Sequence, residues 1–124
     1  MKKYLLFLCL CIVLSSFITI SFTQIANALK SGDASQVAKY LDKTVEITLP
    51  ESTKSYSKNQ AQLVLRQFFS NNPVKDFKLI HESENEGSQY CIGNLTTANG
   101  VFRTTIYMKQ KGDKQLVQEM RFEK

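Results

Sequence analysis

Four polar side chains in the second half of the chain are the candidates for chemistry. Three of them, His81, Thr104 and Gln118, fall in phase with the apolar residues of their strand-like segments, so we expect them to point into the interior. A polar group turned toward a core needs a partner, and several such groups together are typical of a ligand pocket. Together with Tyr90, they are predicted to line one pocket between a sheet and helices.

The same part of the chain gives little support for catalysis. His81, the single histidine, could act as the base of a small isomerase or hydrolase, and this is one alternative. The strand carboxylates Glu46, Glu82, Glu119 and Glu123 alternate with apolar residues, so we expect them to face outward. No catalytic residue is assigned. Without a metal-ligand cluster or a glycine-rich phosphate loop in the sequence, no metal or cofactor is predicted.

The first residues have the features of an export signal. Lys2 and Lys3 precede an apolar run, Tyr4–Phe22, whose second half is diluted by serine and threonine. We predict a secretory signal peptide over residues 1–23, one domain over residues 24–124, and a periplasmic or secreted protein. The alternative is a retained segment that tethers the domain to the inner membrane, because a spanning helix needs roughly 20 apolar residues.

Net charge and cysteine content bear on two questions, whether the protein binds nucleic acid and whether it forms a disulfide. The formal net charge is +5 for the whole chain and +3 without Lys2 and Lys3, and the remaining lysines and arginines are scattered. A nucleic-acid surface would gather them on one face, so no nucleic-acid partner is predicted. Cys91 is the only cysteine outside the signal. It cannot form an internal disulfide, and its strand-like surroundings predict that it is buried.

The first half of the exported part has mainly helical periodicity. Two short helices, or one kinked helix, are predicted over residues 24–41, with a break at Ser31 and Gly32 and a new start capped by Asp33. Alternation over residues 45–49 predicts a strand, and residues 51–56 are expected to form a loop. Ser57 and Gln60 have the spacing of a capping box, which predicts a helix up to Asn71.

Strands and turns fill the second half. Extended segments are predicted over residues 77–82, 89–97, 101–109 and 115–123, separated by turn sequences at 85–87, 99–100 and 112–113. An interruption at Gly93 and Asn94 predicts a β-bulge that bends the second of these strands. The fold class is therefore α+β, with N-terminal helices packed on a curved, mainly antiparallel sheet.

Several local strings resemble a known family. Residues 28–34, ALKSGDA, residues 56–61, YSKNQA, and residues 68–73, FFSNNP, are similar to segments of the exported bacterial family of unknown function 4783 (DUF4783). Residues 77–82, 90–93 and 99–103 continue the likeness. The resemblance implies the cone-shaped nuclear-transport-factor-2-like (NTF2-like, cystatin-like) fold, often with a cavity at its open end. It implies no activity, because this fold serves both enzymes and binding modules.

These observations favour a non-enzymatic binding module for a small apolar ligand or a protein partner. The pocket of His81, Tyr90, Thr104 and Gln118 would be its site. A dimerisation module is a further alternative, in which the exposed face of the sheet would join two copies of the chain as a homodimer.

Overall fold

The structure, a computed structural model, describes residues 22–124. The predicted signal segment lies outside the described residues, except for Phe22 and Thr23. Among residues 22–124, no helix is both long enough and apolar enough to cross a membrane. The predicted export and the alternative membrane tether both remain predictions.

Two short helices open the described chain, as the break at Gly32 predicted. Helix α2 spans Thr23–Ser31 and ends at Gly32, which takes the left-handed conformation (φ 68°) that favours glycine. Helix α3 spans Ala34–Ala38, and the Asp33 carboxylate accepts a hydrogen bond of 2.9 Å from the Ser35 N–H. The predicted cap at Asp33 is therefore confirmed.

Helix α4, Lys58–Asn71, is the longest helix described. Its N-cap Ser57 accepts the Gln60 N–H at 3.3 Å, which confirms the backbone bond that the capping box predicts. The buried side chains Ala61, Leu65, Phe68 and Phe69 form the stripe that packs toward the sheet.

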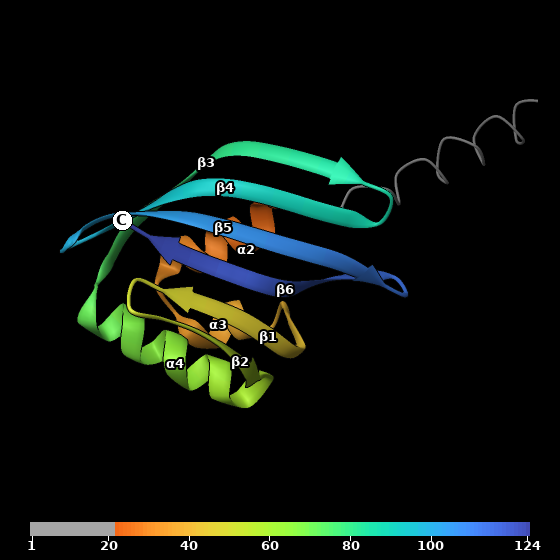
Figure 1. Cartoon of the computed structure of the whole chain (residues 1–124). Coiled ribbons are helices and arrows are strands. Elements are labelled where there is room, and N and C mark those ends of the chain that lie inside the picture. Colours follow the sequence, from red (N-terminus) through yellow and green to blue (C-terminus); the bar gives the residue numbers. More distant parts are fainter. Residues whose placement is uncertain (1–21) are drawn as a thin grey trace, which may run out of the picture.

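The sheet has six strands: β1 Leu41–Leu49, β2 Ser52–Ser57, β3 Val74–Asn85, β4 Ser88–Thr97, β5 Gly100–Lys111 and β6 Lys114–Glu123. Their order across the sheet is β2-β1-β6-β5-β4-β3. All neighbouring strands run antiparallel except β1 and β6. The helices lie behind the curved sheet and beside β2, so one sheet face is left uncovered (Figure 1). The predicted α+β class and curved, mainly antiparallel sheet are thus found.

Two local predictions were wrong. Residues 51–56, expected as a loop, contain most of the edge strand β2, which pairs with β1. The sequence STKSYS shows no apolar alternation, because an exposed edge strand buries few side chains. The predicted bulge in β4 is also absent, since β4 pairs with β5 in continuous register over its whole length.

The bulge lies in the neighbouring strand instead. Pairing between β3 and β4 shifts between Leu79 and His81, which leaves Ile80 as the extra residue. Gly93 faces this site, and a Cβ added to it would lie 2.7 Å from the Lys78 carbonyl oxygen and would also meet the Phe77 ring. The glycine therefore allows the close approach that bends this edge of the sheet.

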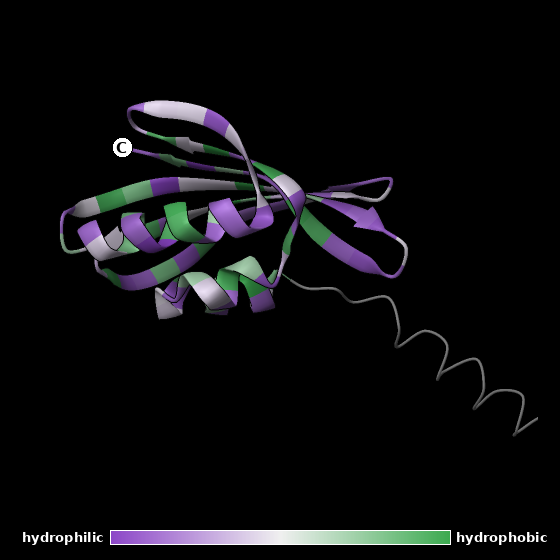
Figure 2. Ribbon diagram, turned by 90° about the horizontal axis from the view of Figure 1, so that it is seen from below, coloured by the Kyte–Doolittle hydropathy of each residue, from purple (hydrophilic) through white to green (hydrophobic). Residues whose placement is uncertain are grey.

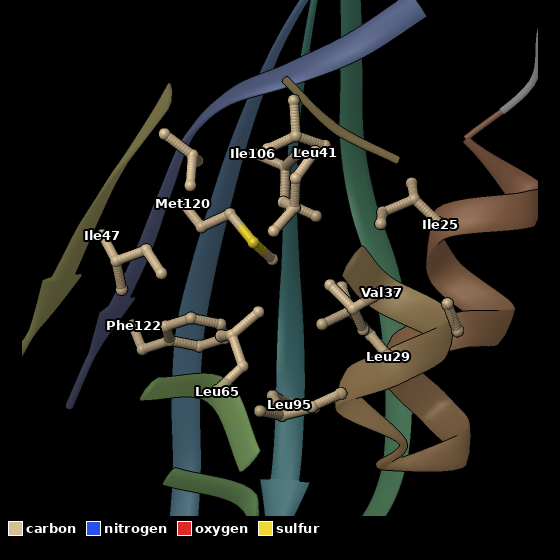
Figure 3. Close-up of a cluster of buried hydrophobic side chains, with 14 of the residues drawn as sticks. Ile25, Leu29, Val37, Leu41, Ile47, Leu65, Leu95, Ile106, Met120 and Phe122 are labelled. Carbon is tan, nitrogen blue, oxygen red and sulfur yellow. The ribbon is translucent and has the colours of Figure 1, made fainter. Parts of the chain in front are cut away.

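Hydrophobic and hydrophilic residues alternate along the ribbons (Figure 2), and the hydrophobic ones meet in one core. Figure 3 shows its centre, where α2, α3 and α4 place Leu29, Val37 and Leu65 against side chains of the sheet such as Met120 and Phe122. Cys91 is completely buried in this core, as predicted.

Phe22 belongs to this core, although it falls inside the predicted signal segment. Its side chain is 5% exposed, and its carbonyl accepts the Ala26 N–H at 2.8 Å.

We predict that a chain starting at Gln24 is less stable than one starting at Phe22 by about 2 kcal/mol, because it loses one buried aromatic side chain. Urea unfolding of the two chains measures the difference, with Phe22→Leu in the longer chain as control. Equal stability of the two chains would contradict the prediction.

Candidate binding site

Thr104, the first of the predicted site residues, is fully inside the core. Its relative exposure is 0%, and its hydroxyl donates to the Phe102 carbonyl oxygen at 3.2 Å. The orientation predicted from the alternation is correct. The hydroxyl is satisfied by its own strand and is enclosed by apolar neighbours.

Gln118 bonds to a carboxylate that the sequence did not single out. Its Nε2 donates to Asp42 Oδ2 at 2.7 Å, and the Lys111 ammonium lies 2.6 Å from the same oxygen. The Lys43 N–H donates to Asp42 Oδ1 at 2.7 Å. These hydrogen bonds, first that from Lys111, lower the pKa of Asp42 from 3.8 to about 2. Asp42 thus ties the β5–β6 hairpin to the start of β1.

Tyr90 and His81 lie on the opposite side of the sheet from Thr104. Along β4 the buried residues are the odd-numbered ones, so Tyr90 faces outward beside its cross-strand partner Tyr107. His81 is exposed and pairs with Ile92, because the bulge at Ile80 reverses the alternation of β3. The structure therefore does not bring the four predicted residues into one pocket.

Three of the four strand carboxylates face outward as predicted, and Glu82 does not. Glu123 is exposed, and Glu46 and Glu119 are half-buried, on the outer face. Glu82 is exposed but pairs with the buried Cys91, so it lies on the inner side of the sheet, because the bulge at Ile80 reverses the alternation of β3. The Arg121 guanidinium donates to Glu119, and this bond raises the pKa of Arg121.

Cys91 offers no nucleophile under ordinary conditions. Burial raises the pKa of its thiol to about 12, so the reactive thiolate is not formed near neutral pH.

Aromatic side chains fill the space between α4 and the sheet. The Phe68 ring centroid lies 4.8 Å from that of Phe122 and 5.2 Å from that of Phe102, and Phe69 lies 6.4 Å from Phe122. With Met120 fully buried beside them, they occupy the interior where a ligand cavity was expected. A small apolar ligand enclosed at that place is therefore not supported.

The fold still opens at one end, in a surface that we call the mouth groove. It has a volume of about 430 Å³ and is open to solvent along one side. Its apolar floor comes from the end of β1, the inner stripe of α4 and the start of β5. The lining residues are Leu49, Pro50, Glu51, Val64, Gln67, Phe68, Asn71, Asn72, Phe102 and Lys124.

Asparagines and a lysine form the rim of the mouth groove. Asn99 Nδ2 donates to the Asn71 carbonyl at 2.7 Å and to Asn72 Oδ1 at 3.1 Å, which ties the end of α4 to the β4–β5 turn. The Lys124 ammonium donates to the Asn99 carbonyl at 3.1 Å and lies 5.2 Å from the centroid of the Phe102 ring. The sequence did not predict this rim, because Asn71 and Asn72 indicate only the end of a helix.

A short helical layer behind a curved six-stranded sheet defines the class of the protein as an NTF2-like α+β cone. An NTF2-like protein of unknown function from Cytophaga hutchinsonii has this fold with a TM-score of 0.58 at 8% identity, over 81% of this chain and 82% of that one. At that identity the likeness concerns the fold alone.

A match to a family model shows the family to which the chain belongs. The model described as "Domain of unknown function (DUF4783)" matches residues 22–123, so the chain belongs to this family. A DUF4783 family protein from Bacteroides fragilis is 31% identical, with a TM-score of 0.78 over 86% of this chain and 98% of that one. One from Bacteroides ovatus is 27% identical, with a TM-score of 0.79 over 82% and 92%. No curated protein matches the sequence significantly.

The cluster of Asp42, Lys111 and Gln118 makes the stability of the fold depend on pH. Because the pKa of Asp42 in the fold, about 2, lies below its ordinary 3.8, the ionised carboxylate stabilises the protein above pH 4 and this contribution is lost as the pH falls toward 2. The free energy of unfolding should therefore fall less between pH 5 and pH 2 in the Asp42→Asn variant than in the parent protein. We expect a difference of about 1 kcal/mol, because solvent at the exposed Lys111 ammonium weakens the ion pair. Urea unfolding at several pH values measures it. Lys111→Gln should move the loss to higher pH, and unchanged slopes in both variants would refute the role of the cluster.

Proposed function

We propose that the protein is a non-enzymatic binding module whose mouth groove receives an apolar side chain of a protein partner. The observation that carries this proposal is the groove of about 430 Å³ with an apolar floor and a polar rim. This volume lies at the small end of the range of ligand pockets, roughly 300–1,000 Å³.

The filled interior favours a protein partner over a small ligand. A small apolar ligand gains affinity when most of its surface is buried, and behind the groove the phenylalanines leave it no deeper space. A side chain that projects from a protein needs only a shallow hollow, because the partner's own surface covers the open side. Leu63 on α4, 60% exposed and next to Val64, extends the apolar contact area beyond the groove.

Polar groups at the rim can orient the partner on the groove. Lys124 and the amides of Asn71 and Asn72 can pair with polar groups around the inserted side chain, and Glu51, which also lines the groove, supplies one acceptor. The side chains of Asn72 and Lys124 are held in place by hydrogen bonds within the protein, so little ordering of them is needed on binding.

The enzymatic alternative has less support. His81 is exposed on an edge strand, and no hydrogen bond joins its ring to a carboxylate or hydroxyl within residues 22–124. The proposed site therefore assigns no role to His81 as a base.

Photo-crosslinking tests the mouth groove. A photoreactive phenylalanine analogue at Gln67, inside the groove, should give a discrete crosslinked partner in the producing cell. The same analogue at Arg66, outside the groove lining on the same helix, should not. Adding Val64→Gln should reduce the Gln67 product at least fivefold, because a polar amide replaces part of the apolar floor. Equal products from both positions, or no effect of Val64→Gln on a folded protein, would contradict the proposal.

Self-association through the outer face of the sheet is a second candidate. This face has a hollow of about 410 Å³ beside Tyr90 and Tyr107, and its rim carries both arginines and glutamates. Mixed charges on one patch suit a two-fold interface, in which each copy's arginines meet the other's carboxylates. Sedimentation equilibrium should then show dimers that Tyr107→Asp dissociates. A monomer at about 1 mM protein would rule this interface out.

A further inference from the structure

A second hollow lies at the opposite end of the strands from the mouth groove. It has a volume of about 290 Å³. The start of α2, the link between α3 and β1, and the β5–β6 hairpin form its walls, and we call it the hairpin pocket.

The floor of the hairpin pocket is apolar. Ile25 and Met108 belong to the core and are almost completely buried, and the half-buried Tyr40 and Leu116 complete the walls. A tyrosine ring and a methionine sulfur both make favourable contacts with an aromatic ring. The floor therefore suits a flat aromatic group.

One side chain that lines the pocket, Gln115, carries a polar atom without a partner. Gln115 Oε1 is buried, and none of the described residues donates a hydrogen bond to it. A buried carbonyl oxygen without a donor costs free energy, so the Gln115 amide gains by turning this oxygen toward a bound molecule that brings an O–H or N–H to its inner end. This atom distinguishes the hairpin pocket from an ordinary surface hollow.

The rim of the pocket is net positive. Lys39 and Lys114 are exposed at its edge, against the single carboxylate of Asp113. A negatively charged group at the outer end of a bound molecule would meet two ammonium groups and one carboxylate, so an anion is favoured over a cation.

The walls of the pocket are held together independently of any ligand. The Lys111–Asp42 ion pair, at 2.6 Å, and the Val117 N–H, which donates to the Tyr40 carbonyl at 2.7 Å, join the hairpin to the segment before β1. The pocket is therefore preformed, which lowers the cost of binding.

We infer that the hairpin pocket binds a small aromatic acid that carries a hydrogen-bond donor on its ring. The ring would lie on Ile25 and Met108, the donor would meet Gln115 Oε1, and the acid group would lie between Lys39 and Lys114. This site is separate from the mouth groove, so the inference does not depend on the proposed function.

Titration with 4-hydroxyphenylacetate tests the inference. In ¹H–¹⁵N spectra of the purified protein, the amide signals of residues 39–40 and 113–116 should shift and approach saturation by about 10 mM probe. Phenylacetate, which lacks the donor, and 4-hydroxyphenylethanol, which lacks the charge, should each bind about tenfold more weakly.

Variants assign the effect to named groups. Gln115→Leu should make 4-hydroxyphenylacetate and phenylacetate bind equally, and Lys114→Gln should weaken both acids. Lys109→Gln, an exposed lysine of β5 outside the pocket, should change neither affinity. The inference is overturned if no shifts appear in this region, if the hydroxyl makes no difference in the parent protein, or if a folded Gln115→Leu variant keeps the preference for the hydroxylated probe.

Discussion

The packing of Phe68 against Phe102 and Phe122 is the contact on which the rest of the structure depends. It joins the longest helix to the two strands at the centre of the sheet, with ring centroids 4.8–5.2 Å apart. Rings at these separations bury large apolar areas and add a directional attraction. Because they fill the inside of the cone, the sheet curves around side chains of its own chain and the openings are pushed to its ends.

The curvature itself depends on a backbone detail. Ile80 is the extra residue of the β3 bulge, and Gly93 on β4 leaves room for the Phe77 ring and the Lys78 carbonyl. The sequence indicated that the strand pairing is irregular near Gly93, but alternation along one strand cannot say which of two partners carries the extra residue. His81 shows the consequence, since one inserted residue moves it from the predicted inner face to the outer face.

Other parts were predictable because local chemistry decides them. The caps at Asp33 and Ser57, the stop at Gly32 and the turns between the last strands all depend on neighbouring residues, and they were found where predicted. The edge strand β2 was missed because its polar residues show no apolar alternation, whereas the Asp42–Lys111–Gln118 cluster and the rim of Asn99 and Lys124 depend on residues far apart in the chain. Periodicity has no means of detecting such pairs, and Asp42 lies just before the alternation that indicated its strand.

The two proposed binding sites lie at the two ends of the strands, where polar side chains border the apolar core. Thr104 bonds to its own strand, and burial keeps the Cys91 thiol protonated, so neither of these two core side chains presents a nucleophile. The ends differ, because there the apolar core meets side chains with unused donors or acceptors. A fold whose interior is saturated in this way can still recognise other molecules, since recognition needs only an apolar floor and a few polar groups at its edge.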